Sequence, residues 1–306
     1  MRSGRSPPTT IRYRRRLANY RVFRERLPLP LVAVELGYGG LFELGPGDAE
    51  ILVQRPGVDV LWQKERLLNL ALAALPPSCT KLLSIDCDVF FTDPGWPEAL
   101  ERLLDDVAIA QPFARVHYLT RHWTPDDPQP EVEFSRQSVA AARAAGLSAE
   151  ACMLPPSETD RRLMKSPGFA WATRRELLDR HGFYDAAIIG GGDTMLAAAA
   201  TGLLEAGARA HHGAPGFRDH FLRWGRPFAD DVGGRIGVLD LDLQNLWHGE
   251  MANRRAGERS ARLAELGYDP CTDIALDAGG GWRWNSDKPE LHRYVYDWFV
   301  GRREDG

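Results

Sequence analysis

The sequence predicts an α/β protein in which a mixed, mainly parallel sheet is flanked by helices. Two observations support this fold class. Apolar runs of strand length alternate along the chain with longer segments whose apolar residues recur at helical spacing, an order that favours parallel strands joined by helices. The 306 residues are also enough for one large domain with a sizeable core. We therefore expect a single domain with one insertion.

The first third of the chain carries the clearest elements. The strongest helix has apolar residues at helical spacing between Leu61 and Leu75, and Pro76 and Pro77 end it. The apolar run at 82–85 that follows predicts a buried parallel strand. In chain order we expect strands at 31–36 and 51–54, the helix at 61–75, the strand at 82–85, a helix from Pro97 through Leu104 and a strand at 107–110.

Composition and charge exclude several classes of protein. The formal net charge of −4 and the pI near 6.1 give no overall attraction to nucleic acid or to anionic membranes. No segment approaches the roughly 18 apolar residues that span a bilayer, and the N-terminus lacks the apolar core of a signal peptide. We therefore expect a cytoplasmic protein without membrane contacts. The cysteines show neither disulfide-framework density nor metal-binding spacing: Cys79, Cys87, Cys152 and Cys271.

Two aspartates one residue apart, Asp86 and Asp88, directly follow the apolar run at 82–85. In open α/β sheets ligands gather at the carboxyl ends of strands, so these carboxylates are expected at a binding site. Carboxylate oxygens suit Mg²⁺ or Mn²⁺, and such an ion commonly keeps positions for substrate phosphate. The pattern indicates a metal-bridged diphosphate. The alternative is a strand end that runs into a solvated turn, where aspartate is common in any case.

The helix before these aspartates shares a pattern with a known family. At 63–69 the chain reads Gln-Lys-Glu-Arg-Leu-Leu-Asn, and the strand after it ends in Asp86-Cys87-Asp88. This order resembles the β-1,4-galactosyltransferase type of GT-A glycosyltransferase, in which an Asn-Arg-x-Lys-Leu-Leu-Asn-like helix precedes a strand ending in Asp-Val-Asp. The resemblance implies a GT-A (Rossmann-like) fold.

Later blocks follow in the order that the family requires. A glycine-rich strand at 168–172 and a further helix lead to three glycines and Asp193, which matches the family's catalytic base in Trp-Gly-Gly-Glu-Asp. This chain has Gly192 where the family has glutamate, and it lacks the tryptophan. His248, in the segment Leu-Trp-His-Gly, is similar to the histidine that completes the metal shell in many GT-A enzymes.

The resemblance implies a division of roles within one site. Asp193 is the catalytic base, and Asp86, Asp88 and His248 hold Mn²⁺ or Mg²⁺. In the family an arginine-rich segment after the first strand holds the nucleotide diphosphate, and guanidinium groups suit phosphate. The expected contacts to the nucleotide-sugar donor come from Arg14, Arg15, Lys64, Arg66, Asp86, Gly191 and Gly192.

Three regions differ from the family or lie outside these motifs. Residues 1–10 lack the apolar strand that usually begins a GT-A domain, so the strand is lost or the true start lies upstream. Residues 114–167 are expected as an insertion with an alanine-rich helix at 138–145, either an acceptor lid or a surface embellishment. The catalytic domain is expected at 1–250, with a helical and aromatic extension packed on it at 251–306. This extension ends in Arg-x-Glu-Asp and is similar to the end of uncharacterised phage and bacterial glycosyltransferases.

The candidate residues also have structural interpretations. Asp193 stands where a helix begins and can be a cap, and a lone histidine such as His248 is more often a structural group than a ligand. The arginines at 12–16 can belong to a solvated amphipathic helix. Competing candidates are a second Asp-x-Asp at 240–242, three further histidines and two tryptophans that can stack on a sugar: His211, His212, His220, Trp282 and Trp284.

The motifs together predict a metal-dependent hexosyltransferase. We expect it to move a sugar from a nucleotide diphosphate donor, a UDP-sugar, to a hydroxyl acceptor with inversion. The acceptor can be a glycan, a small molecule or a modified nucleic acid. One alternative is a sugar-phosphate nucleotidyltransferase, although the glycine-rich basic loop expected after its first strand is absent. The other alternative is a catalytically inactive sugar-binding protein of the same fold.

Overall fold

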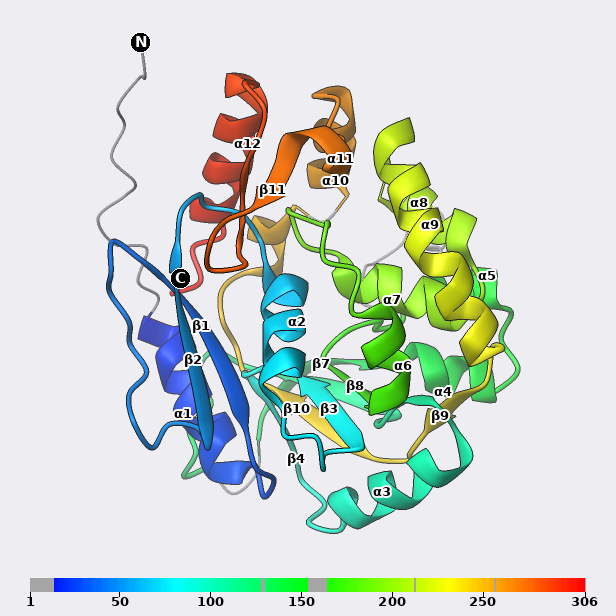
Figure 1. Cartoon of the computed structure of the whole chain (residues 1–306). Coiled ribbons are helices and arrows are strands. Elements are labelled where there is room, and N and C mark those ends of the chain that lie inside the picture. The colour runs from blue at the N-terminus through cyan, green and yellow to red at the C-terminus, as the bar shows by residue number, and fades with distance from the viewer. Residues whose placement is uncertain (1–13, 128–129, 154–163, 212, 256, 306) are drawn as a thin grey trace.

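The computed structural model describes residues 14–127, 130–153, 164–211, 213–255 and 257–305. In this part of the chain the protein is a mixed α/β structure with two four-stranded sheets, two two-stranded sheets and surrounding helices (Figure 1). The predicted α/β class is confirmed. Among these residues no helix is both long enough and apolar enough to cross a membrane. The expectations for the strand at 1–10 and for His212 lie outside the described residues.

The first four-stranded sheet has the order β3-β8-β5-β9. Its strands are β3 (Lys81–Ile85), β8 (Ala170–Arg174), β5 (Ile109–Gln111) and β9 (Ile236–Val238). β8 runs antiparallel to both β3 and β5, whereas β5 and β9 are parallel. β3 is therefore an edge strand, and its residues are only half-buried.

The second four-stranded sheet has the order β4-β10-β6-β7. Its strands are β4 (Val89–Phe91), β10 (Asp242–Asn245), β6 (Arg115–Leu119) and β7 (Val132–Gln137). β10 is parallel to β6 and antiparallel to β4, and β7 is antiparallel to β6. Residues 114–167, expected as an insertion, thus supply an inner strand of this sheet.

The expected single, mainly parallel sheet is wrong for the described residues. Three of their strand pairings are parallel and five are antiparallel. The run at 82–85, expected as a buried parallel strand, pairs antiparallel with β8 at the edge of a sheet. An apolar run in the sequence is the same whether the strand pairs parallel or antiparallel with its neighbour. The direction is decided by the neighbouring strand, which comes from a distant part of the chain.

The predicted helices form close to their expected positions. α2 (Lys64–Ala74) ends before Pro76, and α3 (Trp96–Asp106) carries Pro97 in its first turn. α4 (Val139–Ala144) is capped by Ser138, whose Oγ accepts a hydrogen bond from Ala141 N at 3.0 Å. The other helices are α1 (Arg14–Arg26), α5 (Ala149–Met153), α6 (Arg175–His181), α7 (Gly192–Ala200), α8 (Leu204–Ala210), α9 (Pro215–Val232), the 3₁₀ helix η2 (Met251–Arg254), α10 (Glu258–Glu265), α11 (Pro270–Asp273) and α12 (Pro289–Val300).

Two short sheets complete the fold. β1 (Val32–Tyr38) and β2 (Ile51–Gly57) are parallel, and β11 (Ile274–Leu276) and β12 (Trp282–Trp284) are antiparallel. The segments after residue 250 lie over the end of α2 at which the helix begins (Figure 1). There the side chain of Gln63 donates to Trp282 O at 3.2 Å and accepts from Trp282 N at 2.6 Å. The C-terminal segments therefore hold the start of α2 in place.

The buried interior positions the turn that carries the two aspartates. The larger hydrophobic core surrounds α7, whose residues 195–200 are all buried, and includes Trp171 of β8. A second core gathers residues of α3 and of both larger sheets and includes Phe113 and Val116. The turn at 86–88 leads from β3 of the first sheet directly to β4 of the second. Both sheets thus fix the geometry of this turn.

Candidate functional site

The Asp-x-Asp turn connects the two larger sheets, and its two aspartates belong to different surroundings. Asp86 N donates to Phe169 O at 2.8 Å, which continues the pairing of β3 with β8. Asp88 O accepts from Leu246 N at 2.8 Å, which continues the pairing of β4 with β10. One aspartate is therefore held by the first sheet and the other by the second. A separate cluster of charged side chains surrounds each of them.

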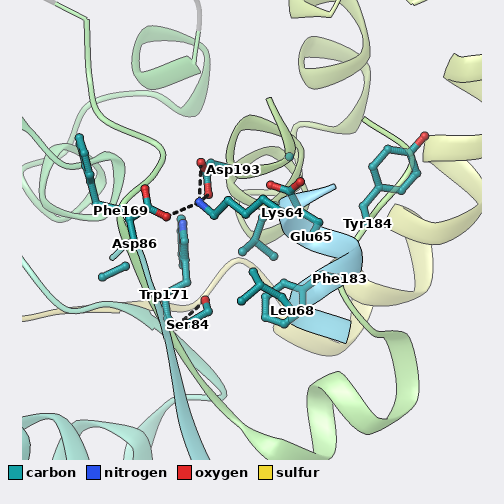
Figure 2. A pocket seen from close by; sticks show the side chains of 13 residues that line it. Lys64, Glu65, Leu68, Ser84, Asp86, Phe169, Trp171, Phe183, Tyr184 and Asp193 are labelled. Carbon is teal, nitrogen blue, oxygen red and sulfur yellow. Dashed lines mark hydrogen bonds and ion pairs between the residues drawn. The ribbon is translucent and has the colours of Figure 1, made fainter. Parts of the chain in front are cut away.

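The Asp86 cluster consists of Lys64, Glu65, Asp86 and Asp193. Lys64 Nζ stands between the two aspartates (Figure 2), 2.5 Å from Asp86 Oδ1 and 2.9 and 3.1 Å from Asp193 Oδ1 and Oδ2. α2 begins at Lys64, and Asp193 lies in the first turn of α7. Both oxygens of the Asp193 carboxylate accept hydrogen bonds from Lys64 Nζ. The predicted base is thus in direct contact with a predicted donor-binding residue.

Burial and mutual charge control protonation in the Asp86 cluster. Burial raises the pKa of Asp86 and of Asp193, and the nearby Lys64 ammonium opposes both shifts. Burial by itself would lower the pKa of Lys64, but Asp193 and Asp86 raise it well above its ordinary value. Lys64 is therefore a permanent cation between two carboxylates.

Glu65 is the member of this cluster that our sequence analysis missed. Only 4% of the residue is exposed, and burial, opposed by Lys64, raises the pKa of its carboxyl to about 8. The carboxyl fits because Gly192 has no side chain: a Cβ there would lie 2.1 Å from Glu65 Cδ. At neutral pH Glu65 keeps its proton. No signal in the sequence distinguishes it from an exposed charged residue of the same helix.

A small pocket lies beside the Asp86 cluster. Its apolar wall is aromatic and aliphatic: Leu68, Phe169, Ala170, Trp171, Phe183, Tyr184 and Leu196. The free volume is about 10 Å³, roughly the space of one water molecule. A sugar must therefore lie at the mouth of this pocket or displace a side chain. Phe169 has φ +77°, an uncommon conformation for an aromatic residue, directly beside Asp86.

The Asp88 cluster consists of Arg16, Asp88, His248, Arg254 and Glu304, which come from distant parts of the chain. His248 Nε2 lies 3.0 Å from Asp88 Oδ2 and accepts a hydrogen bond from Arg254 Nη2 at 2.7 Å. Burial, reinforced by the charge of Arg254, lowers the pKa of His248 well below its ordinary value. The imidazole is therefore neutral near pH 7, the form that binds metals. Because Nε2 accepts a hydrogen bond, the proton of the neutral ring is assigned to Nδ1.

The Asp88 cluster has the features of a partial cation site. Asp88 Oδ1 is buried without a hydrogen-bond partner, and Asp88 Oδ2 lies 3.0 Å from His248 Nε2, whose lone pair an ion would take over from Arg254. Two such electron-pair donors suit a divalent cation. Asp86, the third predicted ligand, is paired with Lys64, and within the described ranges no group of three or more His, Cys, Asp or Glu side chains is arranged for a metal. The residues fit an ion that takes its remaining ligands from substrate phosphate.

The predicted donor-binding arginines, Arg14 and Arg15, contact the C-terminal end of the chain. Their backbone N–H groups donate to the Asp305 carboxylate at 3.2 and 2.9 Å, and the guanidinium of Arg15 lies 5.4 Å from the ring centre of Trp247. The next residue, Arg16, reaches the Asp88 cluster. Its charge opposes the rise in the pKa of Asp88 that burial causes. Within this run of arginines, Arg16 is the residue that the structure places against the Asp88 cluster.

Glu304 joins Arg16 to the C-terminal extension. Only 2% of Glu304 is exposed, and its carboxylate forms ion pairs with Arg16 and Arg302. Its Oε1 lies 3.9 Å from His248 Nδ1. Burial would raise the pKa of Glu304, but the two arginines lower it. The Arg-x-Glu-Asp ending is the sequence signal that pointed to this region, although no role followed from it.

The remaining predicted residues have protein partners of their own. Arg66 Nη1 pairs with Asp185 Oδ2 at 3.0 Å, away from Lys64. Gly191 has φ +100°, and a Cβ there would lie 1.8 Å from His211 Nε2, so this glycine makes room for a histidine. The competing candidates also have structural partners: His220 with Tyr184, Asp242 with Arg115 and His117, Trp282 with Arg66 and the Asp185 carbonyl, and Trp284 with His292.

No protein-family model, curated protein or solved structure matches this chain. What the chain does is therefore argued from the chemistry of the Asp86 and Asp88 clusters.

Proposed function

We propose that this chain is a metal-dependent GT-A glycosyltransferase, which moves a sugar from a UDP-sugar to a hydroxyl group with inversion. One observation carries the proposal. A single turn places Asp86 against the Lys64 cation that also holds Asp193, and places Asp88 against neutral His248. The site thus combines a carboxylate base, a fixed cation and a pair of metal-binding groups, the chemistry that transfer from a nucleotide diphosphate requires.

In this proposal Asp193 is the catalytic base. The acceptor oxygen forms a bond to the anomeric carbon while the bond from that carbon to the diphosphate oxygen breaks, and the electron pair leaves with the diphosphate. The acceptor proton passes to Asp193. Lys64 orients this carboxylate through two hydrogen bonds and favours its ionised form. A single displacement of this kind inverts the anomeric centre.

The Asp88 cluster serves the donor. Asp88 and His248 would hold Mn²⁺ or Mg²⁺, which when bound neutralises charge on the diphosphate. Arg16 supplies a guanidinium next to Asp88, and Lys64 supplies an ammonium next to Asp86. Both are fixed positive charges that attract phosphate oxygens and stabilise the negative charge that develops on the leaving group.

The test is release of free nucleoside diphosphate from UDP-, GDP- and dTDP-sugars, with Mn²⁺ or with a chelator. Wild type is compared with Asp193→Asn and Asp88→Ala. Asp240→Asn is the matched control, because this aspartate belongs to the second Asp-x-Asp and its side chain is 89% exposed. We expect metal-dependent release from one donor, lost in the two site variants and unchanged in the control. Equal release from wild type and Asp193→Asn would overturn the proposal.

The contacts of Lys64 favour one second candidate, a sugar-binding protein without transferase activity. Its ammonium occupies the side of Asp86 that a metal ion would otherwise approach. In that case the wild type would bind nucleotide sugars without releasing diphosphate, and binding would not respond to the chelator.

A further inference from the structure

Glu65 is a buried carboxylic acid that the proposed reaction does not use. It lies at the beginning of α2, one residue after Lys64, and lines the same pocket as Asp86 and Asp193 (Figure 2). In the described ranges no hydrogen bond or ion pair joins its carboxyl to another residue. Burying a carboxyl is costly, and a residue that only fills space is normally apolar. Glu65 therefore invites a functional explanation.

The space for this carboxyl is created by a second element of the fold. Atoms Cγ, Cδ and Oε1 of Glu65 lie 2.5, 2.1 and 2.2 Å from the position that a Cβ of Gly192 would occupy. Gly192 is the residue directly before Asp193. The carboxyl of Glu65 thus stands next to the proposed base, in space that any other residue at 192 would fill. The raised pKa keeps the group protonated at neutral pH, so that it can both donate and accept a hydrogen bond.

The surroundings of Glu65 select for a neutral polar ligand. Asp86 and Asp193 place two carboxylates around the single ammonium of Lys64, which the proposed reaction uses for the donor diphosphate, so no surplus of positive charge remains beside Glu65 for a phosphodiester acceptor. Phe169 lines the same pocket and is only partly buried, so it offers aromatic surface against which a sugar ring packs. Hydroxyl groups are the partners that a carboxylic acid and a carboxylate side by side can bind together.

We propose that Glu65 is an acceptor-binding residue, whose carboxyl hydrogen-bonds a hydroxyl of a neutral sugar next to the hydroxyl that Asp193 deprotonates. This inference rests on the proposed glycosyltransferase function and deepens it, because it assigns the acceptor to neutral sugars and not to nucleic acid. It also gives Gly192 a role, which is to admit the carboxyl of another helix.

The experiment uses p-nitrophenyl β-D-glycosides of glucose, galactose, xylose and N-acetylglucosamine as acceptor probes. Their binding to the intact protein is measured by saturation-transfer NMR without donor, so the result does not depend on transferase activity. The variants are Glu65→Ala, Glu65→Gln and the double variant Glu65→Ala with Gly192→Glu, which returns a carboxyl to the same space from α7. Gly192 has no positive φ, so glutamate suits its backbone. Glu176→Gln, at an exposed position of α6, is the control.

We expect one glycoside to bind the wild type and the control equally. Glu65→Ala should raise the dissociation constant of this glycoside about tenfold, which is the effect of losing one hydrogen bond to a neutral ligand. Glu65→Gln keeps the shape and folding of the site and should weaken binding less, and the double variant should recover most of the affinity.

Several results would overturn this assignment. They are equal binding by wild type and Glu65→Ala, no binding of any glycoside by the wild type, or competition for the pocket by single-stranded DNA. Failure of the glycosyltransferase proposal looks different, because it removes diphosphate release from wild type while glycoside binding and its dependence on residue 65 remain.

Discussion

Arg16 and Glu304 form an ion pair that joins the first described helix to the last residues of the chain. The neighbouring contacts reinforce this junction, since the Asp305 carboxylate accepts from two N–H groups at the start of α1. At Gly249, which has φ +93°, a Cβ would lie 2.9 Å from Arg303 O, so the turn after His248 packs closely on the same tail. The C-terminal tail therefore holds α1 and the His248 turn together beside Asp88.

Replacing Glu304 with glutamine should destabilise the protein. The change takes the carboxylate away from Arg302, whose pair with Glu304 is buried, and from Arg16, whose side chain is 41% exposed. Breaking the buried pair costs on the order of 3 kcal/mol, and the exposed arginine adds little. Since Arg16 and Arg302 lower the pKa of Glu304, the stability that it adds is present above its ordinary value of 4.5 and is lost as the pH falls through its lowered value. Urea unfolding at pH 7 and pH 4 measures both effects. Glu265→Gln, in an exposed pair with Arg262, should change little, and equal effects of the two variants would refute the prediction.

Replacing Lys64 with methionine should lower diphosphate release about 100-fold, the usual effect of removing a charged group that stabilises the transition state. Burial then raises the pKa of Asp193 without opposition from the ammonium. The acidic limb of the pH–rate profile should therefore move to higher pH, and Lys64→Arg should restore it in part. Lys81→Met, which removes an exposed pair with Asp105 from β3, is the control. An unchanged pH profile in Lys64→Met would contradict the contact with Asp193.

Glu65 should make stability depend on pH between its ordinary pKa of 4.5 and its folded-state pKa of about 8. In this window the folded protein holds a proton that the unfolded chain has released, so the free energy of unfolding falls as pH rises. Glu65→Gln has no such proton. The difference between wild type and this variant should fall by up to about 1.4 kcal/mol per pH unit across the window, measured by urea unfolding. A constant difference would mean that Glu65 is ionised in the folded protein.

Replacing Gly191 with alanine should cost more than about 3 kcal/mol of unfolding free energy. The backbone is left-handed at this position, and the new Cβ would collide with the ring of His211. Gly202 separates the two effects, because it also has a positive φ, +76°, but no neighbouring atom lies within 4 Å of the position that its Cβ would take. Gly202→Ala should therefore cost only about 1 kcal/mol. Similar losses in thermal unfolding of the two variants would show that His211 can move aside.

Mn²⁺ should bind weakly to the protein alone and more tightly in the presence of UDP. In the described part of the chain only Asp88 and His248 are arranged as ligands, and phosphate oxygens of UDP would complete the coordination shell. Paramagnetic resonance of free Mn²⁺ measures both affinities. His248→Gln should weaken binding about tenfold or more in the presence of UDP. Tight binding of Mn²⁺ without nucleotide would contradict a two-residue site, and unaltered binding in His248→Gln would exclude this histidine.

Several helices and strands could be predicted because they depend on residues that are close together in the sequence. Apolar spacing and the Pro76-Pro77 pair predicted α2, and the run before Asp86 predicted β3. The motifs also led to residues that do meet: Lys64 with Asp86 and Asp193, and Asp88 with His248. Each motif is a short segment whose position on a helix start or strand end follows from local chemistry.

Residues that join a site through long-range packing could not be predicted from the sequence in the same way. Arg16 reaches the Asp88 cluster where Arg14 and Arg15 were expected, because the packing of α1 decides which side chain points inward. Glu65 looks like a surface residue until Gly192 is found beside it. The strand direction in the first sheet depends on β8, which a local apolar pattern does not specify.

By itself the sequence determined the α/β class, the helices α2 and α3, the strands β1, β2, β3 and β5, and the placement of the two aspartates directly after a strand. The spacing of apolar residues and the positions of proline and glycine determine backbone conformation over a few residues, so these features are encoded locally. Only the tertiary structure decided that Lys64 bridges Asp86 and Asp193 and that Glu304 closes the other side of the turn. Such contacts arise when distant segments pack and bury their charges together, and the energy of that burial belongs to the whole fold.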